Sequence, residues 1–139
     1  MKLVNAVKPS ERLNFLSQQL DDDFGYITSM FEMSVYYYMD KLCIDYSSGI
    51  WEYYKIDNAF FIAPIGDKSY RMVLPSNSNK KDNIAVCNIT AGVIVCLFAL
   101  SHLSNMIKHE KLLDCFDGLV SFAETLESKE NISAIVDIE

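Results

Sequence analysis

The 139-residue sequence lacks the short motifs that most often carry enzyme chemistry. It contains no glycine-rich phosphate loop, no G-x-S-x-G nucleophile elbow, no H-E-x-x-H pair and no paired-carboxylate motif. Cys96 and His102 are six positions apart, about 240° around a helix, so they do not form a local nucleophile–base pair. We therefore expect no catalytic residue and no cofactor, and we interpret the chain as a non-enzyme.

Histidine is scarce, with His102 and His109 as its two occurrences. They lie seven positions apart on or near one helix, and neither has a further metal ligand three or four positions away. We interpret both as surface or helix-end histidines, with His109 where a cation at a helix C-terminus is favourable. No metal-binding residue is expected.

Signals for secretion and for a membrane are also missing. The first residues, MKLVNA, lack the apolar segment of a signal peptide. The apolar run Val93–Leu100 has eight residues and is followed by polar ones, so it is too short to cross a bilayer. The four cysteines form no C-x-x-C pair and lie mostly in apolar runs: Cys43, Cys87, Cys96 and Cys115. We expect a cytoplasmic protein with buried, reduced thiols and no membrane contact.

The charge balance argues against nucleic-acid chemistry. The net charge is −7, with 12 basic and 19 acidic residues, which does not suit a basic nucleic-acid-binding surface. Nor does it suit a protein that imitates DNA. A globule of this length is roughly 35 Å across, and duplex DNA of that length carries about 20 phosphate charges. We expect neither direct DNA binding nor DNA mimicry.

What the chain does have is a dense aromatic stretch between Phe31 and Pro64. In its first part, apolar residues recur at i, i+4, i+7 or i+8, and i+11, which predicts a helix with one buried face: Phe31, Val35, Tyr38 or Met39, and Leu42. Side chains then alternate from Trp51 to Ile56, and a continuous apolar run covers 59–63, with a turn at 56–58 between them. This pattern predicts a helix packed on two strands across an aromatic seam.

The remaining elements flank this stretch. Ser10 is the expected N-cap of an early helix whose buried face holds Leu13, Leu16 and Leu20. We expect a third strand over 70–74, a polar loop over 76–83, a short strand over 83–87 and a central buried helix from Asn88 or Thr90 to about Lys108. A helix with Leu112, Phe116, Leu119, Ala123 and Leu126 on one face follows, then a short helix over 130–138. The predicted fold is α+β: a small antiparallel sheet of about three strands, packed against several helices, in one compact domain over 1–139.

Two segments carry a resemblance to a known family. The residues are Phe31, Glu32, Val35, Tyr36 and Met39, then Gly49, Trp51, Tyr53 and Tyr54, then Asn58, Phe60, Ala63 and Pro64. The second segment is Thr90-Ala91-Gly92 leading into Leu97-Phe98-Ala99-Leu100. With this spacing the chain resembles the ArdB/KlcA antirestriction family, small proteins of plasmids and other mobile elements. It departs from the pattern at Ala59, usually glycine, and at Phe61, usually tyrosine.

The resemblance implies an antirestriction function. Such a protein inhibits the host type I restriction-modification system, blocking endonuclease activity rather than modification, by protein contact and without DNA mimicry. The implied partner is the type I restriction complex or a factor associated with it. Most of the matched residues are expected to be structural: Phe31, Val35, Met39, Gly49, Trp51, Tyr53, Asn58, Phe60, Ala63 and Pro64.

Two alternatives concern the surplus of aromatic residues. The three consecutive tyrosines 36–38 cover about 200° of a helix, so they do not all face one core. Either both faces of the helix are buried, or it exposes a partner surface formed by Glu32, Tyr36, Tyr37 and Asp40.

Trp51 is either a core anchor or a ligand platform. The alternative function is a small-ligand-binding or regulatory domain with an aromatic-lined pocket: Tyr38, Trp51, Tyr53 and Phe60.

Overall fold

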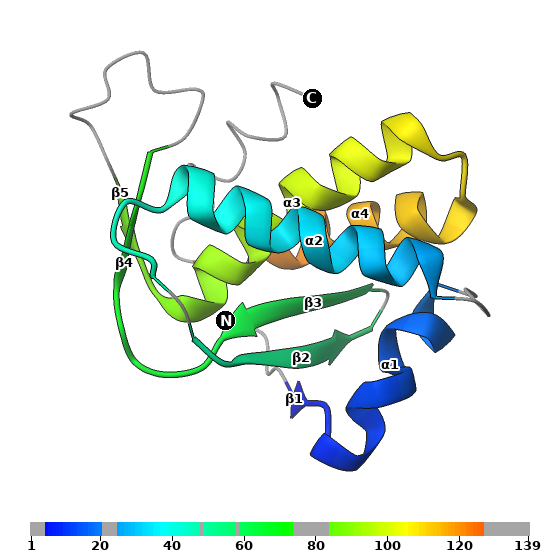
Figure 1. Ribbon diagram of the computed structural model, residues 1–139, viewed down its shortest axis with the longest axis horizontal. Coiled ribbons are helices and arrows are strands. Elements are labelled where there is room, and N and C mark those ends of the chain that lie inside the picture. The colour runs from blue at the N-terminus through cyan, green and yellow to red at the C-terminus, as the bar shows by residue number, and fades with distance from the viewer. Residues whose placement is uncertain (1–4, 21–24, 48, 58, 74–83, 127–139) are drawn as a thin grey trace.

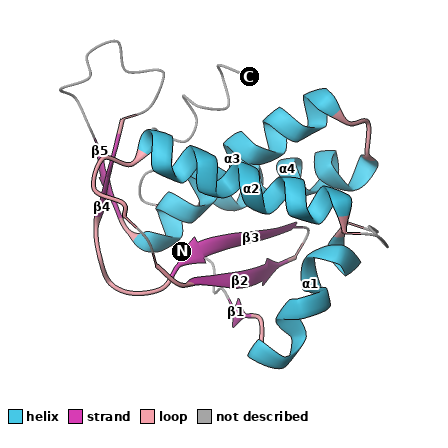
Figure 2. Cartoon of the chain, viewed as in Figure 1, coloured by secondary structure: helices cyan, strands magenta, loops and turns pink. Residues whose placement is uncertain are grey.

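The computed structural model describes residues 5–20, 25–47, 49–57, 59–73 and 84–126, which form an α+β arrangement (Figures 1 and 2). The described helices are α1 (Arg12–Gln19), α2 (Tyr26–Leu42), α3 (Asn88–Met106) and α4 (Glu110–Ala123), with a 3-10 turn η1 (Pro9–Glu11) before α1. The described strands are β1 (Asn5–Ala6), β2 (Trp51–Ile56), β3 (Ala59–Pro64), β4 (Tyr70–Met72) and β5 (Ile84–Val86). The predicted fold class, a small antiparallel sheet packed against helices, is confirmed.

Helix α3 is the centre of the packing. Its side chains are buried without interruption from Thr90 to Ser101, and it contacts α2, α4 and β3. By length and composition this helix is apolar enough to cross a membrane, but 72% of its apolar window is buried inside the protein. Its composition is therefore that of a core helix, and the prediction of a central buried helix is confirmed.

The three-stranded sheet has the order β1-β2-β3, with both pairs antiparallel. The register runs from Trp51 opposite Pro64 to Ile56 opposite Ala59, as expected for a hairpin with a tight turn. The predicted third strand over 70–74 is wrong in its partner, since β4 pairs with β5 in a second sheet. The third strand is β1, and a two-residue strand is too short to show the alternation that predicts strands.

Strand β3 presents its free edge to the helices, and side chains satisfy its backbone there. The Cys96 thiol donates to the Ile62 carbonyl at 3.5 Å and accepts from the Ile62 N–H at 3.4 Å. The Cys115 thiol donates to the Phe60 carbonyl at 3.4 Å, and the Asn88 side-chain amide donates to the Pro64 carbonyl at 2.9 Å. A buried sheet edge without these partners would leave polar groups unpaired, which is unfavourable.

Close contact between α3 and β3 depends on Gly92. A Cβ atom at this position would lie 2.6 Å from the Ile62 carbonyl oxygen and 2.8 Å from the Ala63 Cα atom. Both atoms belong to the backbone of a buried strand, so neither side can move away cheaply. The glycine therefore sets the distance at which the Cys96 thiol reaches the edge of β3.

Two helix predictions need correction. The N-cap of α1 is Glu11 rather than Ser10, because Pro9–Glu11 form a 3-10 turn that displaces the start of the helix. The buried line of α4 runs through Leu112, Cys115, Leu119, Phe122 and Ala123, whereas Phe116 is only half-buried. The buried face of α4 is thus turned toward Cys115, whose thiol donates a hydrogen bond to the Phe60 carbonyl of β3. The short helix predicted over 130–138 lies outside the described residues.

Candidate functional site on helix α2

Helix α2 buries one face and exposes another. The buried face is formed by Phe31, Val35, Met39 and Leu42, which resolves the choice between Tyr38 and Met39 in favour of Met39. On the outer face Met33 and Tyr37 are 71% and 58% exposed. The helix is therefore not buried on both faces, and its aromatic surplus extends onto the protein surface.

On the side of α2 that faces the sheet, Glu32 and Tyr36 contact residues of β2. The Tyr36 ring meets Trp51 edge-on with centroids 5.3 Å apart, and the Trp51 indole N–H donates to the Tyr46 hydroxyl at 3.1 Å. Burial raises the pKa of the Glu32 carboxyl, while a hydrogen bond from Tyr53 partly opposes this shift. Burial, followed by the influence of Tyr53 and Glu32, raises the pKa of Tyr36 to about 12. The Tyr36 hydroxyl therefore remains a hydrogen-bond donor at neutral pH.

On the side that faces α3, a shallow hollow of about 390 Å³ lies between the two helices. Tyr38 lies in this hollow and is stacked on Phe98 of α3, with centroids 5.3 Å apart. Lys41 lies over the Tyr37 ring, 5.5 Å from its centroid. The hollow is lined by Met33, Ser34, Tyr37, Tyr38, Lys41 and His102. Tyrosine and methionine side chains are enriched at protein interfaces, and here two of them, Tyr37 and Met33, are exposed.

The four residues predicted as a partner surface therefore occupy two sides of one helix. Glu32 and Tyr36 lie toward β2 and are half-buried or marginally exposed, with Tyr36 38% exposed. Tyr37 lies on the outer face, where it also lines the hollow against α3, and Asp40 is exposed near the end of the helix. We call these four residues the α2 ridge. Lys41 and His102, which border it, were not singled out by sequence as part of this surface, although Lys41 lies one helical turn after Tyr37.

The residues that match the family motif occupy mostly interior positions. Phe31, Val35 and Met39 lie in the core face of α2, and Trp51 in the sheet is also buried. Gly49 is exposed, and a Cβ atom there would meet nothing within 4 Å, so no steric reason for glycine is evident. Phe60, Ala63 and Pro64 are buried in β3, Tyr53 is half-buried, and Asn58 lies outside the described residues.

The aromatic residues proposed to line a ligand pocket do not share one. Phe60 is enclosed by Phe15 and Phe31, with ring centroids 6.1 Å and 5.6 Å away. Trp51 is buried against Tyr36, and Tyr38 lies on the other side of α2 in the hollow against α3. These contacts give Trp51 and Phe60 the surroundings of core anchors.

Three thiols of the described chain, those of Cys43, Cys96 and Cys115, are poorly suited to nucleophilic chemistry. Burial raises the pKa of the Cys96 thiol far above its usual value, and burial likewise raises the pKa of Cys115 to about 12. Burial followed by the side chain of Asp45 raises the pKa of Cys43 to about 11. Cys43, Cys96 and Cys115 are buried as predicted, whereas Cys87 is exposed, contrary to the prediction for all four. The three buried groups are neutral thiols at physiological pH, and the thiolate is the reactive form.

These raised pKa values predict a loss of stability in alkaline solution. The unfolded chain ionises its thiols near their ordinary pKa of about 8.5, before the folded chain does. The contribution of such a thiol to the free energy of unfolding is therefore expected to be constant below that pH and to fall above it, by about 1.4 kcal/mol per pH unit for a thiol such as Cys115. Urea unfolding from about pH 7 to about pH 10.5 measures the slope. Cys115→Ala should show a smaller slope than the parent protein, and equal slopes would contradict the assignment.

Among the described residues, no group of three histidine, cysteine, aspartate or glutamate side chains is placed to hold a metal ion. His102 is exposed on α3 and meets the Tyr38 ring edge-on. His109 is not at a helix C-terminus as predicted, because α3 ends at Met106 and α4 begins at Glu110. His109 is the N-cap of α4, and its Nδ1 accepts from the Lys111 backbone N–H at 3.2 Å.

Comparison with known proteins gives consistent relatives. Two uncharacterized proteins of Escherichia coli (strain K12), YafX and YfjX, are similar to this chain. YafX is 34% identical over 104 residues, which cover 71% of this chain and 64% of YafX. YfjX is 26% identical over 137 residues, 96% of this chain and 87% of YfjX. The Escherichia coli antirestriction protein KlcA is 30% identical over 97 residues, 66% of this chain and 64% of KlcA. The matches to YafX and KlcA thus span just under two thirds of either relative.

The fold has a solved counterpart. A structure from work on the KlcA and ArdB proteins, described as having a novel fold and antirestriction activity against Type I DNA restriction systems in vivo but not in vitro, matches with a TM-score of 0.78 and 26% identity. The match covers 96% of this chain and 94% of that one. A family model described as "Antirestriction protein" matches residues 44–137. Because that model spans more than half of the sequence and the fold agrees along nearly its whole length, the chain belongs to the antirestriction protein family.

Proposed function

We propose that this protein protects incoming DNA from host type I restriction by contacting a protein, and that it is not an enzyme. The observation that carries the proposal is the structural likeness to the KlcA and ArdB proteins over 96% of the chain. Restriction by the endonuclease would be blocked while modification continues. We place this activity in the cytoplasm of a cell that has received a plasmid or another mobile element.

Charge supports protein contact over DNA mimicry. The net charge is −7, against about 20 phosphate charges on duplex DNA as long as the protein is wide. Exposed basic residues such as Lys41 and Lys68 interrupt the acidic surface. A protein with this charge pattern does not reproduce the continuous negative field of a duplex, and we expect no direct binding to DNA either.

The α2 ridge is the surface we propose for partner contact. Tyr37 and Asp40 are exposed, and Tyr36 presents a protonated hydroxyl beside the half-buried Glu32 carboxyl. Tyrosine and methionine with a few polar groups make up the central part of many protein interfaces. The related proteins are described as active in vivo but not in vitro. That difference favours a partner supplied by the cell, either the assembled restriction complex or a factor associated with it.

Phage plating tests the proposed function directly. Cells carrying a type I restriction system are challenged with unmodified phage, with and without expression of this protein, and pre-modified phage is the control. We expect expression to raise the plating of unmodified phage toward that of pre-modified phage and to leave the latter unchanged. Folded, well-expressed protein that gives no protection against several type I systems would overturn the proposal.

A further inference from the structure

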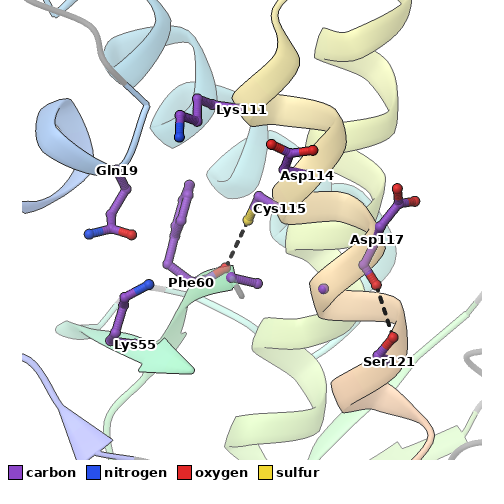
Figure 3. Close-up of a pocket in the computed structure, with 10 residues that line it drawn as sticks. Gln19, Lys55, Phe60, Lys111, Asp114, Cys115, Asp117 and Ser121 are labelled. Carbon is purple, nitrogen blue, oxygen red and sulfur yellow. Dashed lines mark hydrogen bonds between the residues drawn. The ribbon is translucent and has the colours of Figure 1, made fainter. Parts of the chain in front are cut away.

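A second hollow, of about 500 Å³, lies away from the α2 ridge, where the end of α1, the β2–β3 hairpin and α4 meet. Figure 3 shows Gln19, Lys55 and Lys111 arranged around the ring of Phe60, while Asp114 and Asp117 lie further along α4. Among the described residues, its lining includes Gln19, Lys55, Phe60, Lys111, Asp114 and Asp117.

The floor of this hollow is held in place by the core. Phe60 lies opposite Lys55 in the β2–β3 register, so both side chains project from the same face of the sheet. The Phe60 ring packs edge-on against Phe15 and Phe31, and its carbonyl accepts the Cys115 thiol hydrogen. Lys55 is the one charged side chain that β2 and β3 place on this face. Its stem therefore starts from a rigid position.

The charges of the hollow are separated rather than paired. Among the described residues, the ion pair with a nitrogen–oxygen distance within 4 Å is that of Arg12 with Glu52. Neither Lys55 nor Lys111 therefore forms an ion pair with a carboxylate of the described residues. Asp114 and Asp117 line the same hollow but lie beyond Cys115 in Figure 3. Two ammonium groups and the Gln19 amide thus provide donors at one end, and two carboxylates provide acceptors at the other.

We propose that this hollow binds a small phosphate monoester that carries free hydroxyl groups. A phosphate monoester bears about two negative charges at neutral pH, which matches the two ammonium groups of Lys55 and Lys111. Its hydroxyl groups would donate to Asp114 or Asp117, which only accept hydrogen bonds when ionised. The hollow is larger than phosphate alone requires, and its lining beyond the two lysines includes the polar side chains of Gln19, Asp114, Asp117 and Ser121. This site is independent of the α2 ridge and of protection against restriction.

Chemical shift titration of the ¹⁵N-labelled protein tests the site with two probes, inorganic phosphate and glycerol 3-phosphate. Ionic strength is held constant with sodium chloride so that general screening does not change. We expect saturable shifts at Gln19, Lys55 and Lys111 with both probes, and tighter binding of glycerol 3-phosphate. Lys55→Gln and Lys111→Gln should each weaken binding by about tenfold, the effect of losing one charge-assisted hydrogen bond.

Two variants make the test specific. Lys108→Gln removes an exposed lysine that does not line the hollow, so it should bind both probes like the parent protein. Asp117→Asn should reduce the preference for glycerol 3-phosphate over phosphate and leave phosphate binding intact. Absence of saturable binding at millimolar concentration would overturn the proposal. The proposal would also be overturned if the chemical shift changes were scattered over surface lysines and had the same size in Lys55→Gln, Lys111→Gln and Lys108→Gln. Such a result would show non-specific ion association only.

Discussion

Gly92→Ala is expected to destabilise the protein by about 3 kcal/mol or more, a large part of the roughly 5–15 kcal/mol that stabilises a domain of this kind. The added Cβ would lie 2.6 Å from the Ile62 carbonyl oxygen and 2.8 Å from the Ala63 Cα atom. Relief of this overlap requires α3 to move away from β3. That movement lengthens the hydrogen bonds of the Cys96 thiol to Ile62, now 3.4 Å and 3.5 Å. One methyl group therefore affects both packing and the satisfaction of a buried strand edge.

Urea unfolding at neutral pH, followed by circular dichroism, measures this effect. Gly49→Ala is the matched control, because a Cβ atom at Gly49 meets nothing within 4 Å and its backbone does not need glycine. Gly49→Ala should change the free energy of unfolding by less than about 1 kcal/mol. Parent-like stability of Gly92→Ala would mean that α3 and β3 are further apart than the structure shows.

The second large effect is expected on function and not on folding. The double variant Tyr37→Ser/Asp40→Lys should lose protection against type I restriction in phage plating. Both side chains are exposed, so the free energy of unfolding should change by less than about 1 kcal/mol. A lysine in the last turn of α2 is also favourable toward the helix dipole. Loss of protection by a stable protein would therefore indicate a lost contact.

The control variant is Leu113→Ser/Glu124→Lys, which changes one residue of α4 and its C-cap. Leu113 is 53% exposed, which is close to the 58% of Tyr37. Glu124 and Asp40 both lie near the C-terminal end of a helix, α4 and α2 respectively. Both double variants change the net charge equally, so a general charge effect would appear in both. Protection that survives in Tyr37→Ser/Asp40→Lys would exclude these two residues of the α2 ridge as the contact. Loss in both variants would point to a cause other than this surface.

Sequence patterns predicted the elements whose residues carry a strong local signal. Helix α2 was expected from the spacing of Phe31, Val35 and Leu42, and the β2–β3 hairpin from a change of period with a turn between the runs. The same patterns failed for β1 and for the partner of β4. Strand pairing joins residues far apart in sequence, and nothing in the local pattern near Asn5 or Tyr70 specifies which strand each will meet.

The candidate site was predicted in part. Three consecutive tyrosines could not share one helix face, which left open whether both faces of the helix are buried or one of them is exposed; the structure exposes Tyr37. Which of them do so depends on where α3 and β2 lie around α2. Tyr38 is covered by Phe98 and Tyr36 leans on Trp51, so Tyr37 is left as the most exposed of the three. The neighbouring His102 comes from α3 and has no sequence relation to α2.

By itself, the sequence indicated the fold class, the buried face of α2, the central buried helix α3, the family and the net charge of −7. The fold class, the buried faces and the charge follow from composition and from periodicities of a few residues, whereas the family was indicated by resemblance to its motif residues. Tertiary structure decided the roles of Cys96, Cys115 and Gly92, which meet the edge of β3 across more than twenty intervening residues. It also decided which lysines surround Phe60 and which tyrosine of α2 reaches solvent. Hydrogen bonding at a sheet edge and close approach of backbones are properties of pairs of elements, so no single segment encodes them.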